Sequence, residues 1–302
     1  FYDMSIRLVA FFVMSILVSI NFSQNYGDDL YSTGAKTWDT TTANWGTGSG
    51  GPYNTAVWNN ATPDDAILEG TGDAVTISEA ISMGNLTFSN TGTNNDYILS
   101  GNTLSFSPGA LISNSDNRSW QTFTCPITGS PNIHTKDNGA SNEYKGIRFS
   151  PNSGNVTLGD VLNPNNTGST DKSGFALGGT TVGNSVGDIS YAGGDKYGTV
   201  YKEDSGTWTT GDITTGTLRL YDGRLITNGT ITMAYQGLEI TGGILSGNST
   251  VYKSDRRDTF NFPTGTQIAP GDGIGTITFD WGTSASPTSS QWTTSFRSGS
   301  IY

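Results

Sequence analysis

A short pattern recurs along this chain and limits the folds that it can form. It reads Gly, then Asn or Thr, an aliphatic residue, a mostly polar residue and a large apolar residue. The two apolar side chains are two positions apart, so in an extended strand they point to the same face. Gly permits the positive φ of a sharp corner, and each copy predicts a corner followed by a short, half-buried strand. Copies occur at residues 84–88, 154–158, 216–220, 229–233 and 275–279, and a sixth copy at 101–106 carries one extra residue.

The spacing between copies is irregular, which leaves two all-β folds open. No window shows the 3.6-residue periodicity of a helix. A single-stranded right-handed β-helix, or β-solenoid, tolerates irregular spacing because lateral loops leave its coils without disturbing their stacking. A β-sandwich contains similar short strands and is the alternative. Residues 114–146 and 163–195 are less regular and predict long loops or lateral excursions.

Composition and charge exclude several classes of protein. The chain has 302 residues and one cysteine, Cys125, so no intramolecular disulfide can form. Stability must then come from strand ladders and packing. The formal net charge is −11, which disfavours nucleic acid as a partner because the phosphate backbone demands a positive surface.

The first 23 residues predict a signal peptide. We expect translation to start at Met4, after which Arg7 precedes an apolar run over residues 8–20. This run is too short to span a hydrocarbon core of about 30 Å, and cleavage after Ser23 fits the residues that follow it. The mature chain is expected to lack a transmembrane segment and to be extracellular or on the outer cell surface. We expect an opening, capping module over 24–80 and a solenoid body over 81–302.

Several motifs, taken in their order along the chain, resemble one family. Two Trp residues lie in residues 37–45, and a third lies in 57–60. An Asp-Ala step follows in 65–68, and a Val-Thr-aliphatic strand follows in 74–77. A second motif covers residues 201–209 and continues to 216–220. A third covers residues 268–277 and contains an Ala-Pro-Gly corner. This order resembles autotransporter-associated β-strand-repeat proteins: an opening module, a passenger repeat and a late coil.

The resemblance implies a right-handed β-helix that is displayed on, or released from, a bacterial surface. Passengers that transport themselves continue into a C-terminal membrane barrel of amphipathic strands. No such segment follows here, so we expect the chain to be truncated at its C-terminus.

Some right-handed β-helices cleave polysaccharides, and a glycosidase needs two carboxylates on one face. Several carboxylate pairs could be considered, and no catalytic residue is assigned among them. The dense charged cluster with Asp255, Arg256 and Asp258 is kept as a ligand-binding candidate, with a solvated turn as the alternative interpretation. His134 is expected in a polar surface loop, and Cys125 is expected to be a small buried residue. The sequence contains neither a zinc-ligand pattern nor a calcium-loop pattern, so we expect no metal or cofactor.

Trp38, Trp45 and Trp58 allow two interpretations. Exposed rings can stack on sugars, which would suit a glycan-binding protein. The open end of a solenoid, however, exposes strand edges and apolar core and needs a cap. Bulky aromatic residues in the opening module favour cap packing, with sugar binding as the alternative.

The sequence as a whole predicts a secreted or surface-displayed passenger that acts as a structural or adhesive element without intrinsic catalysis. A carbohydrate-active β-helix enzyme, either a polysaccharide lyase or a glycosidase, is the alternative. The expected partners are extracellular glycans or the surface of a host or neighbouring cell, with self-association as a further option and nucleic acid excluded.

Overall fold

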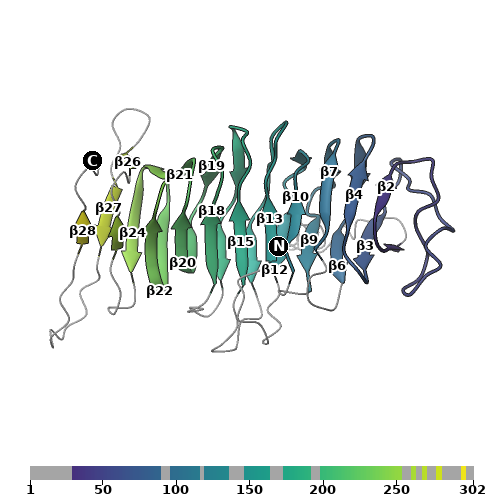
Figure 1. Cartoon of the computed structure of the whole chain (residues 1–302), viewed down its shortest axis with the longest axis horizontal. Helices are drawn as coiled ribbons and strands as arrows, with labels where there is room; N and C mark the ends of the chain where they lie inside the picture. The colour runs from purple at the N-terminus through teal and green to yellow at the C-terminus, as the bar shows by residue number, and fades with distance from the viewer. Residues whose placement is uncertain are drawn as a thin grey trace, which may run out of the picture.

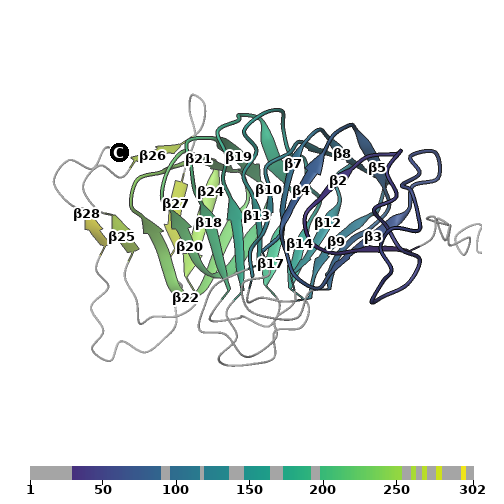
Figure 2. The ribbon, with the colours of Figure 1, turned by 45° about the vertical axis from the view of Figure 1, so that its right-hand side comes forward.

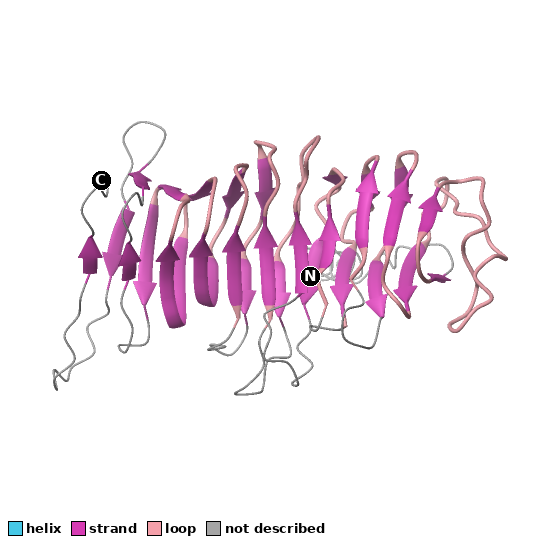
Figure 3. Ribbon diagram, in the orientation of Figure 1, coloured by secondary structure: helices cyan, strands magenta, loops and turns pink. Residues whose placement is uncertain are grey.

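The computed structural model describes most of the chain between residues 29 and 296, and all of its regular elements are strands. Among the described residues there is no helix (Figure 3), and therefore no helix long and apolar enough to cross a membrane. The predicted signal peptide lies outside the described residues. The described segments are 29–89, 96–115, 119–135, 146–163, 173–191, 198–253, 260–262, 267–270, 277–280 and 294–296.

The strands stack into three parallel ladders, A, B and C, so the chain is a β-solenoid and not a β-sandwich. Successive coils follow one another along an elongated rod from β1 to β28 (Figures 1 and 2). Ladder A contains β1 (Asp29–Ser32), β3 (Asp65–Glu69), β6 (Leu86–Ser89), β9 (Leu111–Asn114), β12 (Asn132–Thr135), β14 (Val161–Asn163), β17 (Ile189–Tyr191), β24 (Ser249–Lys253) and β27 (Ile277–Asp280).

Ladder B follows ladder A in each coil, and two long strands bend from one ladder into the other. These are β20 (Ile213–Leu220) and β22 (Thr230–Ile240), whose pairing shifts register between Thr215 and Thr217. The remaining strands of ladder B are β2 (Lys36–Trp38), β4 (Ala74–Ile77), β7 (Ile98–Gly101), β10 (Gln121–Phe123), β13 (Gly146–Phe149), β15 (Gly174–Leu177), β18 (Thr199–Lys202), β25 (Phe260–Phe262) and β28 (Thr294–Phe296).

Ladder C closes each coil before the chain returns to ladder A. Single bridges at Val156 and Thr157 continue this ladder between β11 and β16. Its strands are β5 (Ile81–Met83), β8 (Leu104–Phe106), β11 (Ile127–Thr128), β16 (Asn184–Val186), β19 (Thr207–Thr210), β21 (Arg224–Thr227), β23 (Ile244–Gly247) and β26 (Gln267–Pro270).

The copies of the sequence pattern are irregularly spaced because they fall on strands of different ladders, such as β6 in ladder A and β8 in ladder C, and because the connections between ladders A and B differ in length. Four residues separate β3 from β4, whereas ten separate β12 from β13. The strands themselves keep their register across these differences; Ile133 pairs with Val161, and Val161 pairs with Ile189. The expected division into modules at residue 80 stays a prediction. The strands β3 and β4, which precede this residue, lie in the same ladders A and B as the later strands.

Two stretches that were predicted to be long loops contain strands. Residues 114–146 include β10, β11 and β12, and residues 163–195 include β15, β16 and β17. These strands have two to four residues and carry polar residues such as Gln121 and Thr135 at buried positions, so their hydrophobic alternation is too short to recognise. His134 correspondingly lies on β12 and points outwards, and not in a loop as expected.

The inward side chains form a continuous apolar core with aromatic residues stacked from coil to coil. Phe123 and Phe149 are stacked with ring centroids 4.9 Å apart, and Phe149 continues edge-on to Phe175 at 5.9 Å. Such pairs stabilise by about 0.5–1.5 kcal/mol beyond the burial of their area. Cys125 is fully buried, as the sequence predicted, and burial raises the pKa of its thiol to about 12.

A row of polar side chains supports the corner that leads into ladder A. The Asn132 Oδ1 atom accepts a hydrogen bond from the Asp160 N–H, at 3.0 Å. Asp160 and Asp188 repeat this contact to the next coil at 2.9 and 2.8 Å, and Asp212 repeats it towards Thr230. Each carboxylate therefore fixes the corner of the coil that follows.

The glycine before each of these corners is required by lack of space. A Cβ at Gly229 would lie 2.1 Å from the Asp212 Oδ1 atom, and Gly229 does not adopt positive φ. Gly154 does adopt the positive φ that the sequence pattern predicted, with φ of 65°. The recurrent glycines consequently serve two different purposes at different corners.

Candidate functional site

The three tryptophans form a packed cluster at the N-terminal end of the described rod. The ring centroids of Trp38, Trp45 and Trp58 lie 4.8, 4.9 and 5.1 Å apart, and none of the side chains is more than 2% exposed. The Trp58 indole N–H donates to the Ser82 carbonyl of the adjoining coil at 3.0 Å. Their burial leaves no ring face open to a sugar in this structure, and their role as a cap stays a prediction.

The structure does not test the other candidates from the sequence. Asp255, Arg256 and Asp258 lie outside the described part of the chain. Within that part, no three His, Cys, Asp or Glu side chains are grouped in a way that could hold a metal ion.

Lys202 on β18 is a charged side chain that lies inside the solenoid. It is fully buried in an inward position, and burial lowers the pKa of its ammonium to about 8. The Nζ atom donates to the carbonyl oxygens of Glu203, Asp204 and Asp222 at 2.5, 2.7 and 3.1 Å. These carbonyls belong to the corners of two successive coils, so Lys202 holds the corners together.

A surface site emerges on the outward face of ladder B, where arginine and aromatic residues replace the usual Ser and Thr. The pairing register places Arg148, Ala176, Tyr201, Arg219 and Glu239 in one row across β13, β15, β18, β20 and β22 (Figure 1). They point outwards because residues on either side of each, in the same strand, point into the core. The row runs along the rod axis over five neighbouring strands.

Trp120, which immediately precedes β10, packs against this row. The Arg148 guanidinium carbon lies 4.6 Å from the centroid of the Trp120 ring, within the range of a cation–π contact. The same ring meets Tyr201 edge-on, with centroids 6.2 Å apart. Ala176 lies between Arg148 and Tyr201 in the row, and it is completely buried although it points outwards.

Two ion pairs and a second tyrosine complete the surface. Arg148 contacts Glu203 with Nε and Oε2 atoms 3.2 Å apart, and Arg219 contacts Glu239 at 3.1 Å. All four side chains are partly exposed. Tyr221 is 40% exposed, and its ring centroid lies 6.1 Å from that of Tyr201. We call this surface the aromatic–arginine strip; it consists of Trp120, Arg148, Tyr201, Glu203, Arg219, Tyr221 and Glu239.

The electrostatics of the strip are those of two ion pairs on a partly exposed surface. Burial is the main cause that raises the pKa of the Glu203 carboxyl, and the neighbouring Arg148 opposes the shift. Two arginines face two glutamates, so the formal charge of the strip is balanced. The strip therefore offers hydrogen-bond donors, hydrogen-bond acceptors and ring faces on one rigid surface.

Sequence reasoning missed the strip, although part of its signal was visible. The sequence pattern correctly placed Arg219 outwards between the inward Leu218 and Leu220. Trp120 and Tyr201, however, are 81 positions apart, and only the coil register brings them together. The usable signal would have been Arg and aromatic residues at outward positions of successive strands.

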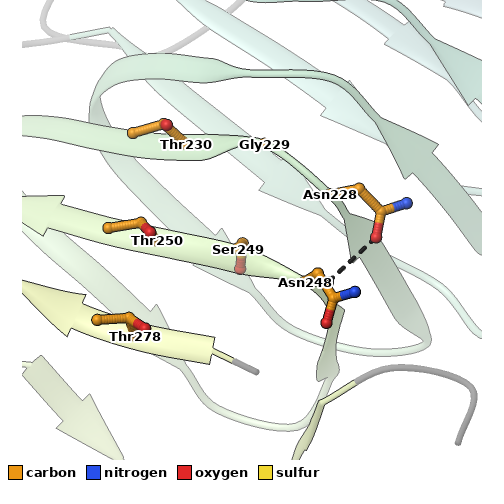
Figure 4. A pocket seen from close by; sticks show the side chains of 7 residues that line it. All are labelled: Asn228, Gly229, Thr230, Asn248, Ser249, Thr250 and Thr278. Atoms are coloured by element: carbon orange, nitrogen blue, oxygen red, sulfur yellow. Dashed lines mark hydrogen bonds between the residues drawn. The ribbon is translucent and has the colours of Figure 1, made fainter. Parts of the chain in front are cut away.

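A separate polar hollow lies at the start of ladder A, towards the C-terminal end of the described rod (Figure 4). It is open, has a volume of about 360 Å³ and contains no titratable side chain in its lining. Thr230, Thr250 and Thr278 line it as one row, because they pair in register across three strands. The Asn228 Oδ1 atom accepts a hydrogen bond from the Asn248 N–H at 3.1 Å, so one amide is already used in fixing the corner.

Comparisons with known proteins identify one partial relative. A segment of 74 residues, 24% of this chain, is 47% identical to a protein named Adhesin BmaC autotransporter from Brucella suis biovar 1 (strain 1330). The matched segment spans only 2% of that much longer protein. No family model matches the chain, and no solved structure matches it. The match is compatible with the autotransporter resemblance in the sequence, but it does not support any particular repeat family.

Proposed function

We propose that this chain is an extracellular, surface-displayed β-solenoid that acts as a structural and adhesive element. The observation that carries the proposal is the 47% identity of a 74-residue segment to an autotransporter adhesin. Stacked parallel ladders give a stiff rod, which is suited to holding a binding surface away from a cell. Aromatic rings and paired charges on the outer face of ladder B supply a surface on which contacts can form.

Adhesion is tested with beads that carry the purified chain. Beads coated with the native chain are incubated with bacterial and epithelial cells, and beads coated with the heat-unfolded chain are the matched control. Attachment of the native beads above the control supports the adhesive role. Equal attachment on every cell type would refute it and leave only a spacer role.

The alternative of a carbohydrate-active enzyme predicts a different result. In this case the chain would release new reducing ends or unsaturated products from pectin, alginate or related polymers, with calcium present. Loss of that release on Asp255→Asn, with binding retained, would replace the adhesive proposal with a catalytic one. The proposed non-catalytic function predicts no product above the rate of the buffer alone.

A further inference from the structure

We propose that the aromatic–arginine strip binds an uncharged polysaccharide chain that lies along the rod axis. This inference rests on the proposed adhesive function, for which it names the site and the class of ligand. The strip is suited to a polymer because it extends over successive coils from β13 to β22.

The rings of the strip are held rigidly enough to act as a stacking surface. Tyr221 is the exposed ring, and it is tilted by 33° against Tyr201 at a centroid distance of 6.1 Å. Tyr201 is 8% exposed and is held in turn by the Trp120 edge. A sugar ring carries an apolar C–H face that can lie on such a ring, and a ring fixed in advance loses little entropy on binding.

The ion pairs supply the polar contacts that sugar hydroxyl groups need. A hydroxyl group both donates and accepts hydrogen bonds, so it can bridge a guanidinium and a carboxylate. Arg219 and Glu239 lie beside Tyr221, and their side chains are 23% and 38% exposed. Arg148 and Glu203 form the second pair further along the axis, with 32% and 24% exposure.

Charge decides between an uncharged and an acidic glycan. Each arginine of the strip already has a glutamate within 3.2 Å, so the strip has no excess positive charge to attract a uronate or sulfate. The chain carries a formal charge of −11, which repels polyanions at long range. An uncharged polymer avoids this repulsion and can still use every polar group of the strip.

The decisive experiment measures binding of the full chain to soluble neutral polymers, such as β-glucans and galactomannans, and to polygalacturonate. Affinity electrophoresis and calorimetry give the dissociation constants. We expect at least one neutral polymer to bind, and Tyr221→Ala to weaken its binding about tenfold, as loss of one aromatic contact implies. Tyr252→Ala removes a partly exposed tyrosine from ladder A, is the matched control, and is expected to leave binding unchanged.

A charge variant tests the choice of ligand. Glu239→Gln removes the negative partner of Arg219, so we expect it to increase binding of polygalacturonate relative to the unmodified chain. Preferential binding of the unmodified chain to polygalacturonate, lost in Tyr221→Ala, would overturn the inference in favour of an acidic glycan. Equal binding of Tyr221→Ala and the unmodified chain, with both folded by circular dichroism, would overturn the site.

The two proposals can fail separately. Beads that attach to cells while the chain binds no neutral polymer would overturn the glycan inference and leave the adhesive function standing. Binding of a neutral polymer through Tyr221, without attachment to any cell type, would overturn the adhesive function and support the strip as a glycan site.

Discussion

A pair of substitutions at one corner tests how neighbouring coils hold each other. A Cβ atom added at Gly211 would lie 2.1 Å from the Oδ1 atom of Asp188, a residue of the preceding coil. The same oxygen accepts a hydrogen bond from the Asp212 N–H at 2.8 Å. Gly211→Ala must therefore displace the carboxylate and break this contact. The substitution Asp188→Ala removes the two side-chain atoms of Asp188 that lie nearest to the added Cβ. The next neighbour is the backbone nitrogen of residue 188 at 3.4 Å, which is an ordinary van der Waals contact.

The magnitude follows from two opposing effects. A hydrogen bond to a charged group contributes about 1.5–3 kcal/mol, and the exposure of Asp188 places this one at the lower end. Replacing Gly by Ala where the backbone permits it stabilises by about 0.4–1 kcal/mol, because the unfolded chain loses freedom. Gly211→Ala should thus cost about 1 kcal/mol in the natural chain. It should stabilise by about 0.5 kcal/mol when Asp188 is already Ala.

Urea denaturation followed by tryptophan fluorescence measures both effects, as shifts of the midpoint at constant slope. Gly48→Ala is the matched control, since its added Cβ would meet nothing within 4 Å. A reversal of sign between the two backgrounds is the expected result. If Gly211→Ala has the same effect in both backgrounds, the carboxylate does not occupy the space in front of Gly211, and the proposed support between coils is refuted.

Three further predictions concern buried side chains. Trp45→Ala should lower the free energy of unfolding by about 3–5 kcal/mol in urea; an unchanged midpoint would contradict its packing against Trp38 and Trp58. Burial lowers the pKa of Lys36 to about 7 and of Lys202 to about 8, so the unfolded chain binds more protons above these values. Stability should therefore rise between pH 8 and 10 in thermal melts, and a fall would contradict the lysine burial. Cys125 should react with a thiol reagent at pH 8 only after unfolding, because burial raises the pKa of its thiol to about 12.

The local features of the fold were predictable because they depend on neighbours in the sequence. Two apolar residues spaced by two, as in Leu218 and Leu220, fix which side of a strand faces the core. The burial of Cys125 followed from its residue type. The choice of a solenoid over a sandwich needed the family resemblance, because a half-buried strand looks alike in both folds.

The features that were missed depend on the neighbouring coil. The sequence contains a repeated Gly-Asp dipeptide, at residues 159–160, 187–188 and 211–212. The structural role of these dipeptides can be recognised only in the folded chain, where the Asp of one coil faces the Gly of the next. The carboxylate there fills the space that a Cβ would take. The same limit applies to Lys202, whose carbonyl partners come from two successive coils. Sequence alone does not supply the coil length that brings these groups together.

The physics of stacking also explains why the aromatic–arginine strip can form here without weakening the fold. Stability in a solenoid comes mainly from contacts between adjacent coils, and these use the inward rows and the corners. The outward positions of ladder B lie outside these inward rows, so Arg219 or Tyr201 can stand there in place of Ser or Thr without disturbing the core. The stacked backbones then hold such side chains at the fixed spacing of parallel strands, about 4.8 Å. A row of outward residues is consequently free to vary in chemistry while its geometry stays rigid, which is the combination that recognition of a long polymer needs.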